Sequence, residues 1–533
     1  MTSIWSIGKP TGSRASEALL ARCSVYSRQK IVVPSQQRFT STLQVAAKAS
    51  STSTIQHPLS VLPTHVLLRS LLVSTISSSP LLLRLSLWTM SVLSKPNRGF
   101  LLNVDRNPII HGILKKTFYE QFCAGETDAE TRKTIQELKD MGFRGVIMTY
   151  AKETVFDHRT NTEQGLGIAA LEAEKNNDTL SPAVARCANI EAWRKGTIET
   201  VDQLHNGDYL AVKYDTIAPN FLSHSPKGYH QIPVTNISFG WHRLTGAGPT
   251  VTQAFSKGEL PPTQMLEALD EICSRCESRK VRILVDAESH HFLSGILRVT
   301  LDLMRKYNRN GHALIYNTYQ AYLKSTKDTI ERHLTAAQEE GFTLGLKLVR
   351  GAYIASDERS LIHDTKADTD NAYNGIAQGA LKQSLGKFGN ETTFPSVNLF
   401  LASHNKESVL SAHQLHKQRL SAGLPTVPVG FAQLHGMSDE VSFSLLSLKG
   451  SDGTPEVYKC STWGTMGECL AYLLRRAVEN RDAVLRTNDE YNALKTEFGR
   501  RIRSIFSSPR RDELEVVYGK RSYETKNTMP MII

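Results

Sequence analysis

Residues 344–353 read LGLKLVRGAY, which is typical of a buried strand in a parallel sheet. The first six residues are nearly all apolar, as in a strand that is covered on both faces. The last four turn polar and end in Gly-Ala-Tyr. Residues 283–287, ILVDA, repeat the pattern with an apolar run that ends at a carboxylate. Both runs predict strands whose carboxyl ends carry functional groups.

Eight runs of this kind occur from about residue 140 onward, separated by helix-periodic segments. Alternation of strands and helices implies parallel pairing, and eight units close naturally as a barrel. We therefore predict the α/β class, as a (βα)8 TIM-like barrel with an N-terminal helical extension. A doubly wound open sheet is the alternative architecture. The predicted strands are 142–151, 209–217, 280–289, 312–320, 342–353, 396–405, 426–437 and 456–464.

Two long polar segments, 156–182 and 218–261, follow the first and second predicted strands. Because βα loops emerge at the carboxyl ends of strands, both segments are expected on the functional face of the barrel. We predict that the barrel occupies 136–490. The remaining 491–533 are expected to form a C-terminal helix and a charged tail.

The net charge of +11 is concentrated near the amino terminus. Residues 1–104 contain eleven Lys and Arg residues and one acid, Glu17, which leaves 52 basic and 51 acidic residues in the remaining chain. A nearly neutral barrel argues against nucleic acid as a partner. The leader is rich in Ser, Thr and Arg, so we predict a mitochondrial transit peptide at 1–58. A disordered Ser/Thr-rich tail is the alternative.

Residues 59–102 are strongly apolar, but Arg69, Pro80 and Arg84 interrupt them. A membrane span needs about 18 apolar residues in a row with few charges. We therefore predict two short helices that pack on the catalytic domain, within a helical N-terminal segment at 59–135. A membrane span is the alternative.

The seven cysteines are scattered and odd in number, which does not fit a disulfide framework. Cys273 and Cys276 have the spacing of metal ligands, but no second pair lies at a suitable distance. They fall in a helical pattern with Leu269 and Ile272, so we interpret them as helix cysteines. No metal is predicted.

Polar side chains gather at the carboxyl ends of the predicted strands, where the catalytic groups of a barrel collect. A satisfied structural polar group is the ordinary explanation for any one of them. Six such strand ends in succession indicate a functional site instead. They are Lys213, 286–288, 317–320, 347–353, 403–405 and 433–437.

Residues 468–480 form a helical pattern with a charged face after the last strand. Tyr472, Arg475, Arg476 and Glu479 are spaced i, i+3, i+4 and i+7, so they share one side of the helix. Two adjacent guanidinium groups suit a carboxylate or a phosphate, and Glu479 can pair with one of them. The alternative is a solvated Arg–Glu face. The position after strand eight directs this face toward the barrel mouth.

Seven motifs in series resemble proline dehydrogenase. The match runs from about residue 80 to about 490, in the order of the family and across all eight barrel units. Each motif alone is weak, but the series is specific. No aldehyde dehydrogenase module follows, so the chain resembles the monofunctional mitochondrial type. The motifs are FCAGET (122–127), LVDAES (284–289), YNTYQAYLK (316–324), KLVRGAY (347–353), ASHN (402–405), AQLHGM (432–437) and YLLRRAVEN (472–480).

The resemblance implies oxidation of L-proline to (S)-1-pyrroline-5-carboxylate, the first step of proline catabolism to glutamate. It implies hydride transfer from proline C5 to N5 of FAD, the expected cofactor, and electron transfer from there to ubiquinone. The expected location is the matrix side of the inner mitochondrial membrane, in peripheral contact with the bilayer.

The family's functional residues carry over position by position. Arg475 and Arg476 would hold the proline carboxylate, with Glu479 fixing their geometry, while Tyr353 and Tyr472 wall the pyrrolidine ring. The candidate catalytic residues are Lys213, Asp286 and Tyr353, and the candidate substrate-binding residues are Tyr472, Arg475, Arg476 and Glu479. The residues implied for the FAD site are Gln320, Lys347, Val349, Gly351, Thr369, Ser403, His404, Asn405 and Gln433.

Two positions depart from the family pattern. Lys347 stands where bacterial relatives carry Arg, which keeps the charge but loses the fork of hydrogen-bond donors. Cys460 stands where the family usually has a Tyr, twelve residues before Tyr472. Tyr458 lies two residues earlier on the same strand face, so it is a candidate substitute for the missing ring.

Three other functions compete with this interpretation. Hydroxyproline dehydrogenase is a sister specificity that differs in contacts to a ring hydroxyl. A catalytically inactive barrel with a binding or regulatory role predicts gaps among the mouth residues, which are instead complete. A flavin-free lyase would use Lys213 as a Schiff base and predicts a colourless protein.

Overall fold

A computed structural model describes most of the chain after residue 57. The described residues are 58–93, 99–151, 154–157, 162–165, 188–213, 243–244, 254, 257–354, 357–448, 454–482 and 484–506. In the last two helices the backbone is described, but the side chains of 471, 475–476, 478–482, 484–488 and 506 are not.

Eight parallel strands form a closed barrel. Their order is β12-β11-β10-β9-β8-β7-β5-β2, and β12 also pairs with β2, which closes the ring. All eight predicted strands are confirmed, and closure excludes the open sheet. The strands are β2 (Gly145–Tyr150), β5 (Tyr209–Val212), β7 (Arg282–Val285), β8 (Ile315–Gln320), β9 (Leu344–Val349), β10 (Val397–Ala402), β11 (Val429–Leu434) and β12 (Glu456–Trp463).

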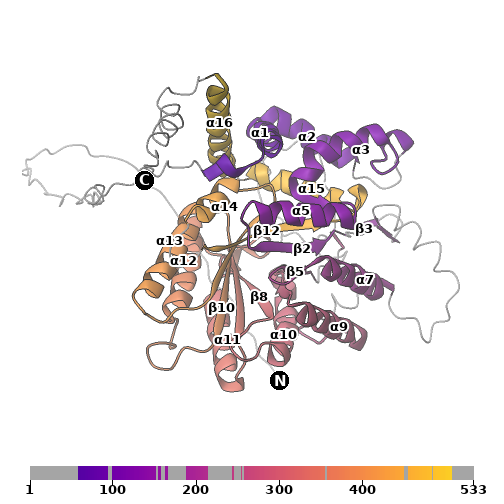
Figure 1. Ribbon diagram of the computed structural model, residues 1–533. Coiled ribbons are helices and arrows are strands. Elements are labelled where there is room, and N and C mark those ends of the chain that lie inside the picture. Colours follow the sequence, from indigo (N-terminus) through magenta and orange to yellow (C-terminus); the bar gives the residue numbers. More distant parts are fainter. Residues whose placement is uncertain are drawn as a thin grey trace, which may run out of the picture. The chain divides into compact units, whose positions relative to one another are not determined.

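A helix follows each barrel strand (Figure 1). The helices after the first seven strands cover the outside of the barrel, whereas the helix after β12 packs against the N-terminal helices. The apolar faces of these helices and the outward strand residues form one large core around the barrel. Cys273 and Cys276 are both buried in α9, as ordinary helix cysteines. The helices are α7 (Ala188–Gln203), α9 (Thr263–Arg279), α10 (His290–Tyr307), α11 (Thr326–Glu340), α12 (Lys366–Lys382), α13 (Lys406–Ser421), α14 (Asp439–Leu446) and α15 (Met466–Asp482), with α16 (Val484–Phe506) after them.

A second core fills the inside of the barrel near the amino ends of the strands. It is built around four rings, those of Tyr209, Tyr316, Phe400 and Tyr458, whose contacting centroids lie 5.0–6.1 Å apart. This aromatic plug fills the interior of the lower half of the barrel. The polar strand ends are thereby confined to the upper half.

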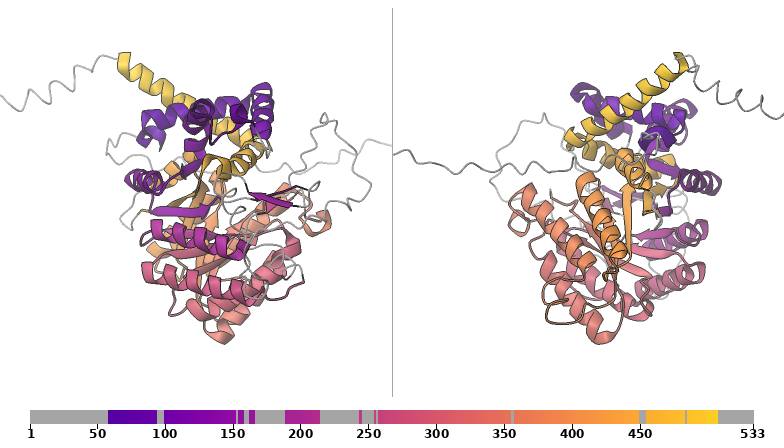
Figure 2. Two further views of the ribbon diagram at one scale, coloured as in Figure 1. Left: turned by 90° about the vertical axis from the view of Figure 1, so that its right-hand side faces the viewer. Right: turned by 60° about the vertical axis from the view of Figure 1, so that its left-hand side comes forward.

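The N-terminal segment is helical and lies on the same side as α15 and α16 in all three views (Figures 1 and 2). Two short helices, α1 and α2, stand where the sequence predicts two, and the short strand β1 pairs with β12. The elements are α1 (Thr64–Ser78), α2 (Pro80–Leu93), α3 (Pro108–Leu114), α4 (Glu120–Phe122), β1 (Cys123–Gly125) and α5 (Asp128–Asp140), with short turns of other helix types at Pro58–Val61, Phe100–Leu102 and Lys115–Tyr119. A further short turn of this kind, Arg359–Leu361, lies in the barrel between β9 and α12.

Among the described residues, no single helix has the length and apolar character to cross a bilayer; α1 and α2 reach that hydropathy only as a pair, bent by 102°. A small antiparallel sheet of β3 (Thr154–Asp157), β4 (Thr162–Gly165) and β6 (Arg243–Leu244) lies in the long loops and is absent from the sequence prediction. Most of the two predicted functional-face loops and the leader lie outside the described residues. The domain boundaries stay predictions.

Candidate active site

A cavity of about 570 Å³ lies at the carboxyl ends of the barrel strands. Residues from all eight strands, or from the turns directly after them, form its wall, together with Tyr472 of α15. The strand ends thus converge as predicted for a barrel. Eleven of the sixteen predicted site residues line it: Lys213, Asp286, Gln320, Lys347, Val349, Gly351, Tyr353, Ser403, His404, Gln433 and Tyr472.

Two predicted FAD-site residues do not line this cavity. Thr369 lies in the first turns of α12, where its hydroxyl donates to the carbonyl of Thr365. Asn405 is the N-cap of α13, and its side-chain oxygen accepts from the backbone N–H of Ser408 at 2.9 Å. Both have local structural roles, and their part in an FAD site stays a prediction.

The predicted substrate clamp lies on α15, which begins just after β12. Arg475, Arg476 and Glu479 fall within this helix, but their side chains lie outside the described residues. Tyr472, on the predicted face, is buried and reaches the cavity. The helix is therefore correctly placed, while the clamp itself stays a prediction.

An ion pair joins two predicted site residues across one intervening strand. Nζ of Lys347 on β9 donates to Oδ1 of Asp286, just after β7, at 2.6 Å. Both side chains are largely buried in the cavity wall. A charge-assisted hydrogen bond of this kind fixes an ammonium and a carboxylate at the rim of the same cavity.

A second pair involves Glu288, which lies in the predicted strand end 286–288 but is not among the predicted site residues. Glu288 is only 2% exposed, and its carboxylate Oε2 accepts a hydrogen bond of 2.6 Å from the hydroxyl of Tyr353. The amide of Gln320 donates to the Glu288 carbonyl at 2.9 Å. Glu288 therefore orients the Tyr353 ring. Its position two residues after Asp286, on the same face of an extended chain, is the signal that could have found it.

Arg350 lies in the predicted strand end 347–353 without a predicted role, and it braces the mouth. Its guanidinium donates to Oγ of Ser403 at 2.7 Å and pairs with Asp370 at 2.7 Å. It also lies 4.3 Å from the ring centre of Tyr373, a cation–π contact. Burial raises the pKa of Tyr373, so the phenol stays neutral. These contacts tie the end of β9 to β10 and α12.

The turn after β9 requires glycine. Gly351 has a φ of +141°, and a Cβ there would lie 2.4 Å from the ring of Tyr322. Any other residue would collide with this ring and adopt a rare backbone conformation. The glycine of the KLVRGAY motif thus lets the chain turn into the cavity and deliver Tyr353.

Amide and imidazole groups complete the wall on the β10–β11 side. Gln433 donates to the carbonyl of Ser403 at 3.1 Å, and its side-chain oxygen accepts from Ser442 at 2.9 Å. Nε2 of His404 accepts from the backbone N–H of Leu434 at 3.1 Å. These bonds fix the predicted residues on rigid elements.

The N-terminal segment positions α15. The backbone N–H of Gly467 donates to Oδ1 of Asp105 at 2.9 Å, and the hydroxyl of Tyr119 donates to the carbonyl of Gly464 at 2.6 Å. Leu83 and Leu87 of α2 form a buried cluster with Ala477. The helix that carries Tyr472 is therefore held from outside the barrel.

Tyr458 does not replace the missing family tyrosine. It shares the inward face of β12 with Cys460, as the sequence predicts, but it belongs to the aromatic plug and does not line the mouth cavity. Cys460 does line it. The prediction that Tyr458 replaces this tyrosine was wrong, because a position two residues earlier on a strand lies about 6.6 Å deeper in the barrel.

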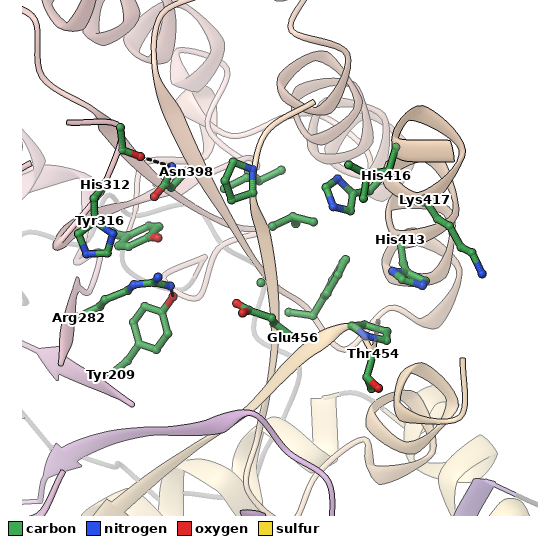
Figure 3. Close-up of a pocket in the computed structure, with 18 residues that line it drawn as sticks. Tyr209, Arg282, His312, Tyr316, Asn398, His413, His416, Lys417, Thr454 and Glu456 are labelled. Atoms are coloured by element: carbon green, nitrogen blue, oxygen red, sulfur yellow. Dashed lines mark hydrogen bonds between the residues drawn. The ribbon is translucent and has the colours of Figure 1, made fainter. Parts of the chain in front are cut away.

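A second cavity, of about 380 Å³, opens at the amino ends of the strands (Figure 3). Arg282 in its wall donates to the hydroxyl of Tyr209 at 2.8 Å. Glu456, on another strand, also lines this cavity. Burial lowers the pKa of His312, His413 and His416, which also line it. None of the predicted site residues whose side chains the structure describes is in this wall, so we place the candidate site at the opposite end.

Comparisons with known proteins agree with this geometry. A probable mitochondrial proline dehydrogenase of Schizosaccharomyces pombe is 29% identical over 455 residues, covering 82% of this chain and 88% of the relative. Mitochondrial proline dehydrogenase 1 of Homo sapiens is 32% identical over 67% of this chain and 58% of its own length. A hydroxyproline dehydrogenase of Bos taurus is 29% identical over 73% of this chain and 82% of its own length.

The fold has a counterpart among solved structures. Proline utilization A from Bdellovibrio bacteriovorus, inactivated by N-propargylglycine, superposes with a TM-score of 0.51 at 15% identity, over 78% of this chain and 41% of that one. The family model for proline dehydrogenase matches residues 131–489, which include every strand of the barrel and all of α15. On this match, the chain belongs to the proline dehydrogenase family.

Proposed function

We propose that this protein oxidises L-proline to (S)-1-pyrroline-5-carboxylate, with FAD as hydride acceptor and ubiquinone as the final electron acceptor. The observation that carries the proposal is the single cavity into which Lys213, Asp286, Lys347, Tyr353 and Tyr472 converge. Membership of the family supports the substrate, and the names of the relatives support a mitochondrial location.

The donor set of the cavity fits a flavin. Its wall offers the ammonium groups of Lys213 and Lys347 and the amides of Gln320 and Gln433, all on barrel strands or directly after them. A flat heterocycle with carbonyl and ring-nitrogen acceptors requires donors of this kind. When bound, FAD supplies the acceptor for the hydride of proline C5.

The residues of the chain bind and orient the substrate. We propose that Arg475 and Arg476 grip the proline carboxylate, because adjacent guanidinium forks give a small zwitterion one fixed pose. The Tyr353 ring, oriented by Glu288, and the Tyr472 ring flank the pyrrolidine. Proline reacts as the neutral amine, since only a free lone pair on nitrogen can expel the hydride.

We propose peripheral contact with the matrix side of the inner mitochondrial membrane. Ubiquinone is dissolved in the bilayer, so an enzyme that reduces it must approach the membrane surface. The mitochondrial names of the relatives and the apolar N-terminal helices support this placement.

An absorbance spectrum tests the function directly. The purified protein should be yellow, and its flavin bands should bleach when L-proline is added without oxygen. A protein that stays colourless after reconstitution with FAD contradicts the proposal and favours an inactive barrel or a flavin-free lyase.

Oxidation of hydroxyproline is a second candidate, favoured by one observation. Cys460 lines the cavity at the position where the family usually has a Tyr, and the smaller side chain leaves room for a ring substituent. Hydroxyproline dehydrogenases are also among the relatives. Comparing kcat/KM for L-proline and trans-4-hydroxy-L-proline separates the two, and Cys460→Tyr should shift the ratio toward proline.

A further inference from the structure

Helix α2 has two apolar faces, only one of which is covered. Leu81, Leu85 and Trp88 are 72%, 63% and 57% exposed. Their spacing of i, i+4 and i+7 puts them on one side of the helix. The opposite side is buried and packs Leu83 and Leu87 against Ala477 of α15. The packing of α2 on α15 therefore does not need the exposed apolar stripe of Leu81, Leu85 and Trp88.

Cations accompany the exposed apolar side chains. Arg84 is exposed and lies within the α2 stripe, three residues after Leu81. Residues 58–104 contain no Asp or Glu. Across α3 and the turn after it, Ile109, Ile113 and Lys116 are exposed at i, i+4 and i+7. Two neighbouring elements thus combine large apolar residues with a cation and no acid in the stripe.

This chemistry matches the interfacial layer of a bilayer. Leu and Trp side chains partition into the region between headgroups and acyl chains, and Arg reaches anionic phosphates from there. A bend of 102° between α1 and α2 prevents them from forming one straight span. The charge pattern also disfavours a symmetric contact with a second copy, because a twofold axis through the stripe would bring Arg84 close to its own equivalent.

We propose that the α2 stripe, Leu81, Arg84, Leu85 and Trp88, inserts into the surface of an anionic phospholipid bilayer, with Ile109 and Ile113 of α3 in support. The inference rests on the proposed function, since it names the surface that brings the enzyme to its membrane-dissolved acceptor. α2 packs directly on α15, whose Tyr472 lines the cavity, so the docking surface lies one helix layer from the active site.

Trp88 provides a site-specific test with the full chain. Vesicles of phosphatidylcholine with and without phosphatidylglycerol, each carrying brominated acyl chains, are added while tryptophan emission is recorded. The expected result is quenching with the anionic vesicles that is absent in Trp88→Phe. Vesicle cosedimentation of the Leu81→Ser/Leu85→Ser variant should fall about tenfold, since each side chain loses its apolar transfer term. Arg84→Gln should weaken only the anionic case.

Matched controls separate this proposal from the function itself. Leu420 and Leu424 are also about half exposed, near the end of α13, and Leu420→Ser/Leu424→Ser should bind vesicles like the parent. Turnover of proline with a water-soluble dye should be equal in all variants. Unquenched Trp88, or equal cosedimentation of the α2 and α13 variants, overturns the proposal even if the enzyme is active. Loss of a dimer in Leu81→Ser/Leu85→Ser by light scattering, without loss of vesicle binding, assigns the stripe to a second copy instead.

Discussion

Lys347 and Asp286 face each other across β8, with Nζ and Oδ1 2.6 Å apart. Lys347 belongs to β9 and Asp286 follows β7, so the pair joins two strands that do not touch along their backbones. The ammonium is kept at the cavity wall by a carboxylate that is itself fixed to the barrel. Its position is therefore set before any ligand arrives.

Removing this ammonium should slow the reaction. Lys347→Met leaves the Asp286 carboxylate without its partner and takes a positive charge from the proposed flavin site, so we expect kcat to fall about 100-fold. The midpoint potential of the flavin should also drop, because a cation stabilises the reduced anionic form. Lys347→Arg keeps the charge and should retain most of both. Unchanged kcat and potential in Lys347→Met would contradict the role.

Glu288 should act through Tyr353. Glu288→Gln weakens the hydrogen bond that orients the ring, so the KM for proline should rise by about three- to tenfold with flavin content unchanged. The double variant Glu288→Gln/Tyr353→Phe should match Tyr353→Phe alone, since the second change has nothing left to disturb. Additive losses in this double-mutant cycle would show that Glu288 has a separate task.

The guanidinium groups of α15 should determine proline affinity. Arg475→Ala and Arg476→Ala each remove a charged hydrogen bond to the substrate carboxylate, so the KM for proline should rise by about 10²-fold while FAD is retained. Arg132→Ala, on the exposed side of α5, is the matched control. Wild-type proline kinetics in both α15 variants would rule out the clamp.

Packing of α2 on α15 should matter for both stability and substrate binding. Leu87→Ala opens a cavity beside Ala477 and should cost about 2–4 kcal/mol of unfolding free energy. The KM for proline should rise as well, because α15 loses its outer support. Leu85→Ala, on the exposed side of the same helix, should change the free energy of unfolding by less than about 0.5 kcal/mol. Equal melting temperatures for the two variants would refute this support.

Acidification should destabilise the fold partly through His435. Burial, together with the nearby charges of Lys459 and Arg69, lowers the pKa of this histidine to about 3. Its contribution to stability is complete above pH 6.5 and is lost as the pH falls from there toward 3, because the unfolded chain takes up the proton first. His435→Asn should flatten the decline of melting temperature between pH 7 and pH 5. The exposed His205→Asn should leave it as in the parent.

The sequence predicted the barrel because buried parallel strands are nearly continuous apolar runs, as in 344–349, and their order implies closure. It also predicted much of the cavity wall, because Lys213, Gln320 and Gln433 stand at equivalent ends of the predicted strands. Depth was harder to predict. Tyr458 is on the expected face of β12 but lies one layer deeper, in the aromatic plug. The periodicity of a strand predicts which face a side chain is on, but not how deep in the barrel it lies.

Contacts between remote segments were also beyond the sequence. Thr369 lies in α12 outside the cavity wall, and its role in an FAD site stays a prediction. Arg350 sits between Lys347 and Tyr353 in a motif already in use, and its partners Ser403 and Asp370 are distant in sequence. A contact between remote segments leaves no periodic signal in either of them.

The pairing of β12 with β2 means that the ring is completed by its last strand. A polypeptide that stops before residue 456 would present two open sheet edges, those of β2 and β11, with backbone groups available to neighbours. Such fragments should self-associate, and they would lack α15 altogether. Chains that end early, or from which β12 and α15 have been cleaved, should therefore have no partial activity. A nascent chain needs protection from aggregation until β12 has been synthesised.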